Sequence, residues 1–262
     1  MTVPERVANG TRSASQTSQY EECPEKYRLQ RIEKVTPRPA AWSHQGSAFH
    51  EACEAYERSD RKMPSEEAVE VFSDAYTALT NSALDKESNL ARWMTAGNVS
   101  GETDMVNRYA LGQSQVVRYV EWARESGPTI WKTSDGTPGL ELHVQAEIGG
   151  VAVQGYIDQL TEEPDSSVRV RDLKTGSTRS KFQLKTYTVL ARKVFGVAVN
   201  KADWFMAKTG GLSRALDVSK VEEEEVGEVF AAMDAGVKAG NFPARPGWHC
   251  RFCDVSHACA FS

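Results

Sequence analysis

Residues 154–174, QGYIDQLTEEPDSSVRVRDLK, predict two strands joined by a turn. The first strand is expected over Val151–Leu160, which is rich in β-branched and apolar residues. The segment Glu162–Ser167 contains a proline, an aspartate and two serines, as turns do. The second strand is expected over Val168–Lys174, where apolar and charged residues alternate and give the strand two different faces.

This pairing brings two acids and a lysine together. Side chains two apart on a strand point to the same face, so Asp172 and Lys174 share one, and the neighbouring strand can place Asp158 beside them. Two carboxylates repel each other unless a cation lies between them, and Mg²⁺ prefers such oxygen ligands. A bound cation activates water for phosphate hydrolysis, and a lysine orients that water or stabilises the developing charge. Asp-x-Lys alone, however, is more typical of a surface hairpin with ordinary charges.

Further motifs, in their order and spacing, resemble the PD-(D/E)xK nuclease superfamily, in its RecB-like exonuclease branch. The resemblance implies an α/β fold with a restriction-endonuclease-like core, a central mixed sheet flanked by helices. No proline precedes Asp158, and Asp172 stands where many relatives have glutamate. In chain order, the motifs are the opening Ser15–Arg28, Gly46-x-x-x-His50, Gly155-Tyr-Ile-Asp158, Asp172-Leu-Lys174-Thr-Gly176 and Gln183-x-x-x-Tyr187.

The resemblance also implies roles for the site residues. Asp158 and Asp172 are expected to bind Mg²⁺ or Mn²⁺, with His50 and the carbonyl oxygen of Leu173 as further ligands. Without the resemblance, His50 would be better interpreted as a hydrogen-bonded structural histidine. Lys174 is expected to position the attacking water or to stabilise the charge that develops on the phosphate.

Three residues of the helix expected over 179–195 extend the candidate site. Arg179, Gln183 and Tyr187 are spaced by four and form one stripe on that helix. The resemblance implies that Gln183 and Tyr187 steady the substrate, and we expect the stripe with Arg179 to hold a nucleic-acid backbone. The alternative, an exposed polar face, suits Tyr187 poorly.

Charge is distributed unevenly along the chain. The net charge of −5 is not typical of a nucleic-acid-binding protein, but binding depends on local fields. Between Val168 and Lys193, eight basic residues stand against one acid, Asp172. The basic density therefore falls on the candidate site, with a solvated helix face as the alternative.

The five cysteines include three in the tail, Cys250, Cys253 and Cys259. In a cytosolic protein, Cys-x2-Cys spacing favours a metal site over disulfides. The spacing leaves open zinc, with a tail histidine as ligand, and a [4Fe-4S] cluster. The resemblance implies the cluster, because CRISPR-associated exonucleases and the AddB subunit of bacterial helicase–nucleases have one cysteine before the nuclease core and three after it. Cys23 would then be the fourth ligand.

One nuclease domain is expected over residues 15–262, after a flexible lead at residues 1–14. Within the domain we expect a helical insertion at about 60–130, the catalytic sheet and helix at 139–218, and a cluster-binding tail at 248–262. No apolar run reaches the roughly 18 residues of a membrane span, and the N-terminus lacks the apolar core of a signal peptide. We therefore expect a cytoplasmic protein with no membrane partner.

Together these features predict a metal-dependent DNA exonuclease that hydrolyses phosphodiester bonds, with single-stranded ends as the expected substrate. The chain has no Gly-x4-Gly-Lys-Ser/Thr motif and so is not itself an ATP-driven helicase. A helicase, a recombination protein or a CRISPR-adaptation protein is the expected kind of partner. Two alternatives stay open: a non-catalytic nucleic-acid-binding subunit, which the intact acids and lysine argue against, and a zinc-stapled interaction protein whose strand motifs are coincidental.

Overall fold

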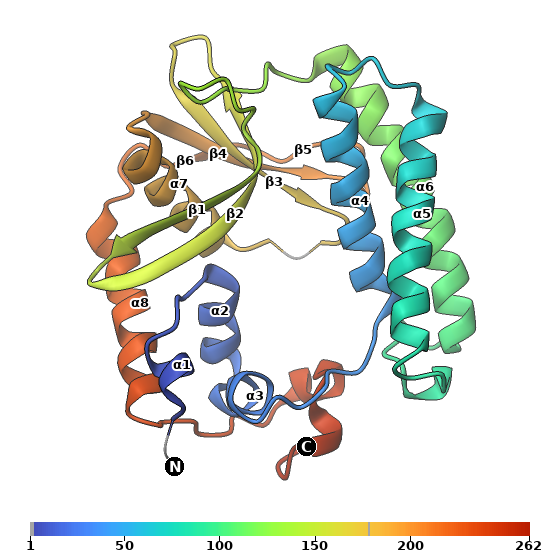
Figure 1. Ribbon diagram of the computed structural model, residues 1–262, viewed down its shortest axis with the longest axis vertical. Helices are drawn as coiled ribbons and strands as arrows, with labels where there is room; N and C mark the ends of the chain where they lie inside the picture. The colour runs from blue at the N-terminus through green and yellow to red at the C-terminus, as the bar shows by residue number, and fades with distance from the viewer. Residues whose placement is uncertain (1–2, 178) are drawn as a thin grey trace.

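The computed structural model describes residues 3–177 and 179–262 and contains a mixed sheet of six strands in this described part (Figure 1). The strands are β1 (Leu140–Ile148), β2 (Val151–Glu162), β3 (Val168–Lys174), β4 (Val199–Met206), β5 (Gly211–Leu212) and β6 (Leu216–Asp217). Their order is β1-β2-β3-β4-β5, with β6 also paired to β4. The β3–β4 pair is parallel and the other pairs are antiparallel. This architecture confirms the α/β prediction.

Helices cover the sheet and extend beyond it. They are α1 (Glu5–Ala8), α2 (Ala14–Glu22), α3 (Pro24–Tyr27), α4 (Ala41–Arg58), α5 (Ser65–Leu84), α6 (Gly101–Ser126), α7 (Lys181–Phe195) and α8 (Glu223–Lys238), with short π or 3-10 turns η1 (Arg28–Ile32), η2 (Leu90–Arg92), η3 (Trp248–Phe252) and η4 (Ser256–Ala258). The sequence pattern predicts the bounds of β3 as observed. None of the described helices is long and apolar enough to cross a membrane.

Two hydrophobic clusters pack on opposite faces of the sheet, and a third joins α1, α2 and α3 to α8. Trp204 packs with α7 and α8, whereas its neighbour Phe205 packs with α4, α5 and α6. Adjacent strand residues point to opposite faces, so these two side chains identify the two layers. The region expected as a helical insertion contains α5 and α6, which pack on α4 beside the sheet (Figure 1).

The lead that we expected to be flexible is docked in the structure from Val3 onward. Arg12 is only 1% exposed, and its guanidinium lies 2.7 Å from the carboxylate of Asp234 on α8. The same guanidinium donates hydrogen bonds to the carbonyls of Val7 and Ala8. A buried charge requires such partners, so the arginine holds this segment against the folded domain.

Candidate active site and cysteine tail

Strands β2 and β3 separate at the two predicted acids. The last pair of their ladder is Gln159 with Arg171, and the same register places Asp158 opposite Asp172. At this point the Asp158 carboxylate accepts a hydrogen bond of 2.7 Å from the backbone N–H of Leu173. Asp158 is 7% exposed and Asp172 is fully buried. The structure thus brings both acids to one fork between strands, and we call this region the fork.

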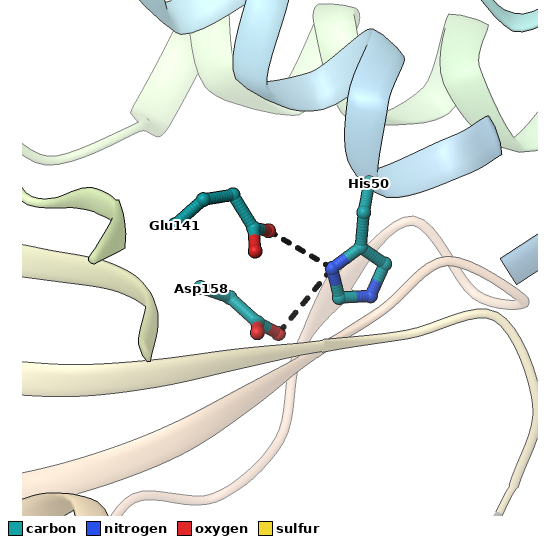
Figure 2. A group of neighbouring side chains, drawn as sticks. All are labelled: His50, Glu141 and Asp158. Atoms are coloured by element: carbon teal, nitrogen blue, oxygen red, sulfur yellow. Dashed lines mark hydrogen bonds and ion pairs between the residues drawn. The ribbon is translucent and has the colours of Figure 1, made fainter. Parts of the chain in front are cut away.

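His50 reaches the fork from α4. Its Nδ1 lies 3.1 Å from Oε1 of Glu141 and 3.7 Å from Oδ2 of Asp158 (Figure 2). Its Nε2 lies 3.0 Å from the carbonyl oxygen of Leu173. A carbonyl only accepts, so Nε2 carries a proton and Nδ1 faces the two carboxylates. One ligand atom each from His50, Glu141 and Asp158 lie within 4.8 Å of one another, a spacing that suits a single metal ion.

Glu141 is a candidate ligand that sequence reasoning did not select. The pairs Leu140–Gln159 and Leu142–Ile157 put Glu141 opposite Asp158. Its φ of +46° lies in the left-handed region, which a glutamate rarely adopts. Backbone strain of this kind clusters at functional sites. The sequence does contain a signal for this position. Glu141 precedes the hairpin turn at positions 149–150 by the same number of residues as Asp158 follows it, so the two residues are expected to lie opposite each other in the hairpin.

The pKa values of these groups reflect crowded, buried charge. Burial alone would lower the pKa of His50, but Asp158 and Glu141 outweigh this effect and raise the pKa to about 9. Burial raises the pKa of Asp158 to about 7, although the nearby His50 opposes the shift. Burial also raises the pKa of Asp172 against the effect of Lys174. Shifts of this kind mark functional sites, and a bound cation would favour the ionised acids and displace the proton on Nδ1.

Lys174 lies beside Asp172, with Nζ 2.9 Å from Oδ1 and 2.8 Å from Oδ2. Nζ also donates to Oε1 of Gln183 at 3.3 Å, and Nε2 of Gln183 donates to the Tyr187 hydroxyl at 3.0 Å. Tyr187 is only 8% exposed. It packs so closely on β2 that a Cβ at Gly155 would lie 2.7 Å from its ring. Two residues of the predicted substrate stripe therefore form a hydrogen-bonded chain that orients the lysine.

The third residue of that stripe has a different environment. Arg179 is exposed, and its guanidinium lies 5.8 Å from the ring centroid of Trp204. It precedes α7, which begins at Lys181. Contact between Arg179 and a nucleic-acid backbone stays a prediction, and the exposed position leaves the guanidinium accessible to a phosphate.

A surface groove of about 860 Å³ opens onto the fork. Its lining includes Ser43, Ser47 and His50 on α4, and Glu141 and Tyr156 from β1 and β2. The α4 residues are spaced by three or four and therefore follow one side of the helix. His50 and Glu141 are thus accessible to a substrate that lies along α4.

The four predicted cluster ligands line one pocket of about 250 Å³. Cys23 immediately precedes α3, and Cys250, Cys253 and Cys259 come from the tail, so the pocket joins the two ends of the domain. In residues 3–177 and 179–262, no three of these thiols have Sγ atoms that all lie within 4.8 Å of one another. The fifth cysteine, Cys53, is buried in the core between α4, α5 and α6.

Comparison with known proteins agrees with this geometry over the length of the chain. The family model of the PD-(D/E)XK nuclease superfamily matches residues 11–260. Gene 69 protein of Mycobacterium phage D29 is 37% identical over 258 residues, which cover 95% of this chain and 96% of that protein. Gene 69 protein of Mycobacterium phage L5 is 34% identical over 277 residues, which cover 95% of each chain.

A solved structure shares the fold. It is a protein from Eubacterium rectale described as a candidate exonuclease, with a TM-score of 0.52 at 10% identity, and the match covers 100% of this chain and 95% of that one. At this identity the likeness concerns the fold alone. The match of the family model across nearly all residues, together with the acids and lysine at the fork, shows that this chain belongs to the PD-(D/E)XK nuclease superfamily.

Proposed function

We propose that this nuclease is a metal-dependent exonuclease that degrades single-stranded DNA from its ends and carries a structural [4Fe-4S] cluster. The observation that supports catalysis is the convergence of His50, Asp158, Asp172 and Lys174 at one fork beside an open groove. The preference for single-stranded ends comes from the resemblance of these motifs to the RecB-like branch. Hydrolysis of nucleic acid itself follows from the family.

The donor set at the fork suits a divalent cation. His50, Glu141 and Asp158 offer one nitrogen and two carboxylate oxygens in a small space, and Mg²⁺ and Mn²⁺ bind such carboxylates. A cation held there supplies a Lewis acid for the phosphate and lowers the pKa of a bound water. Asp172 and the carbonyl of Leu173 are the further proposed ligands. The carbonyl oxygen has two lone pairs, so its contact with His50 leaves it able to bind a cation.

The protein's own groups orient the reaction. The N–H of Leu173 holds the Asp158 carboxylate in place, and Gln183 holds the Lys174 ammonium next to Asp172. Lys174 places a positive charge where the attacked phosphate develops negative charge, and a charge positioned in advance requires no reorganisation during the reaction. Tyr187 fixes Gln183 from the core side.

The preference for an iron–sulfur cluster over zinc comes from the resemblance, which has one cysteine before the nuclease core and three after it. The pocket lined by Cys23, Cys250, Cys253 and Cys259 brings these four residues together and so supports a shared site. The role is structural, since phosphodiester hydrolysis involves no electron transfer.

The biological setting that we favour is phage DNA processing. Both relatives described above are phage proteins, and each matches nearly the full chain. This origin supports phage DNA processing over CRISPR adaptation. A helicase or recombination protein remains the proposed partner.

Cleavage of end-labelled single-stranded DNA tests the proposal. Anaerobically prepared protein is incubated with Mg²⁺ or Mn²⁺, and wild type is compared with Asp172→Ala and Lys174→Ala. We expect wild type to release nucleotides from one end and the folded variants to be inactive; placing the label at the 5′ or the 3′ end gives the polarity. If folded, cluster-loaded wild type leaves every DNA form intact, a non-catalytic binding subunit becomes the better account. Internal cuts in circular single strands would contradict the exonuclease assignment.

A further inference from the structure

The C-terminal tail exposes large aromatic side chains. Trp248 is 78% exposed, more than any other large hydrophobic side chain in the described residues, and Phe252 is 60% exposed. Their ring centroids lie 6.1 Å apart at an interplanar angle of 72°, and both line the mouth of the cysteine pocket. Exposed aromatic groups that cluster in this way mark an interaction site.

The charges around these rings favour an anionic partner. Residues 241–262 carry Arg245 and Arg251, both exposed, against a single acid, Asp254. The carboxylate of Asp254 already has partners, because Gln30 donates a hydrogen bond of 2.7 Å to it and the Lys26 ammonium lies 3.9 Å away. Residues 241–262 thus carry one more base than acid, and Glu22, which also lines the pocket, is paired with Lys26 at 3.4 Å. Aromatic rings next to cations are the chemistry that binds single-stranded nucleic acid, since bases stack and phosphates pair with the cations.

The tail is also hydrogen-bonded to the segment that leads into α4. The guanidinium of Arg38 donates to the carbonyl of Cys253 and to the hydroxyl of Ser256. Helix α4 starts three residues later at Ala41, and its groove-lining residues run from Ser43 to His50. Figure 1 shows the tail beside α3, below the end of α4 that this linking segment enters. At 1.5 Å per residue, His50 lies about 14 Å along the helix from its start.

We propose that Trp248 and Phe252 form a stacking platform for the single-stranded part of the DNA that has not yet entered the active site. Bases stack on the two rings, Arg251 binds the phosphate backbone, and the strand continues along α4 to the fork. This inference rests on the proposed function for its substrate class. Stacking on an aromatic side chain contributes about 1–3 kcal/mol per base, so losing one ring weakens binding by roughly 5- to 150-fold.

Equilibrium binding separates the platform from catalysis. Fluorescence anisotropy is measured with labelled oligothymidylates of about 5 and about 20 nucleotides, using Lys174→Ala protein so that the DNA is not cut. Trp248→Ala and Phe252→Ala are compared with Trp248→Tyr, which keeps a stacking ring, and with Phe261→Ala. Phe261 is a matched control, because it is 57% exposed in the same tail and does not line the pocket. Iron content and melting temperature show whether each variant keeps its cluster and fold.

We expect both alanine variants to lose affinity for the longer strand by at least 5-fold, with little change for the shorter one. Trp248→Tyr should restore the affinity, and Phe261→Ala should match the parent protein. Unchanged binding of the longer strand by cluster-loaded Trp248→Ala and Phe252→Ala would overturn the platform and leave a protein partner as the occupant of the tail. An equal loss of affinity in Phe261→Ala would overturn the assignment of the stacking platform to Trp248 and Phe252.

The same proteins with Lys174 restored distinguish this inference from the proposed function. If wild type cuts DNA and binding does not depend on Trp248, the platform fails and the exonuclease stands. If binding depends on Trp248 and wild type cuts no DNA, the platform stands and the exonuclease fails.

Discussion

The fork and the cysteine tail both collect metal-binding side chains, but the protein builds them in different ways. At the fork, Asp172 is fully buried and Asp158 is 7% exposed; Asp158 accepts a hydrogen bond from the backbone of β3, and Asp172 accepts one from Lys174 on its own strand. In the tail, residues 248–262, the backbone forms two short 3-10 turns, and Val255 is the one buried residue. The fork is thus positioned by the packed sheet, whereas the tail has little core of its own.

This difference predicts what each metal contributes. A cation at the fork adds chemistry to a site that already has its geometry. The proposed cluster in the tail would supply folding free energy, because its ligands come from both ends of the domain and it would add metal–thiolate bonds to the hydrogen bonds that Gln30 and Arg38 make with the tail. Substitutions at the two places should therefore have separable effects, on rate at the fork and on stability in the tail.

The largest effect is expected from Asp172→Asn and Lys174→Ala. Each removes charge that acts at the developing transition state, and the cleavage rate should fall by roughly 10²–10³-fold or more. Single-turnover cleavage of end-labelled DNA measures the rate, and absorbance near 400 nm follows the cluster. Glu147→Gln is the control, because Glu147 is an exposed acid on the same strand as Glu141. Loss of iron in the Asp172 or Lys174 variant would show that substitutions at the fork also affect the tail, and would contradict the separate effects on rate and on stability.

Cys23→Ser should affect the stability of the tail more than the chemistry at the fork. We expect loss of the iron absorbance, a lower melting temperature and faster proteolysis after Arg251, because the tail loses one of its links to the N-terminal segment. Cys53→Ala should keep the cluster, since Cys53 lies in the core cluster with α4, α5 and α6. Metal analysis, thermal unfolding and limited trypsin digestion provide the readouts. Full iron content in folded Cys23→Ser would show that the fourth ligand is another residue.

A smaller effect is expected from Glu141→Gln, which keeps the shape of the side chain and removes its charge. The affinity of the fork for Mn²⁺ should fall by at least about 10-fold, as losses around metal sites do. The Mn²⁺ concentration that gives half-maximal cleavage, and calorimetric titration without DNA, measure the change. Equal Mn²⁺ affinity in the variant and wild type would exclude Glu141 as a ligand.

The smallest effect is expected from Gly155→Ala, which tests how the core positions Lys174. The added methyl group would lie 2.7 Å from the Tyr187 ring, and overpacking of this kind lowers the free energy of unfolding by about 1–3 kcal/mol. Urea denaturation measures this change, and the Gly155→Ala, Tyr187→Leu double variant should recover part of it. Additive losses in the double variant would mean that the ring and the methyl group do not clash.

Local pattern predicted the two strands that carry Asp158, Asp172 and Lys174, whereas the role of His50 came from the family resemblance and Glu141 was not selected. Alternation predicted β3 with both of its ends. Alternation cannot delimit β5 and β6, because each covers only two residues. Short edge strands carry too few residues for alternation to mark their ends.

Asp158, Asp172 and the tail cysteines could be selected from the sequence because their type and spacing form local motifs, although the spacing left open which metal the cysteines bind. Tertiary structure alone decided three other features: the place of Glu141 at the fork, the burial of Tyr187 and the docking of Arg12 on Asp234. Each depends on strand register or on contact between distant segments. Such contacts form only when the chain packs, because burial and pairing of a side chain are set by its neighbours in space.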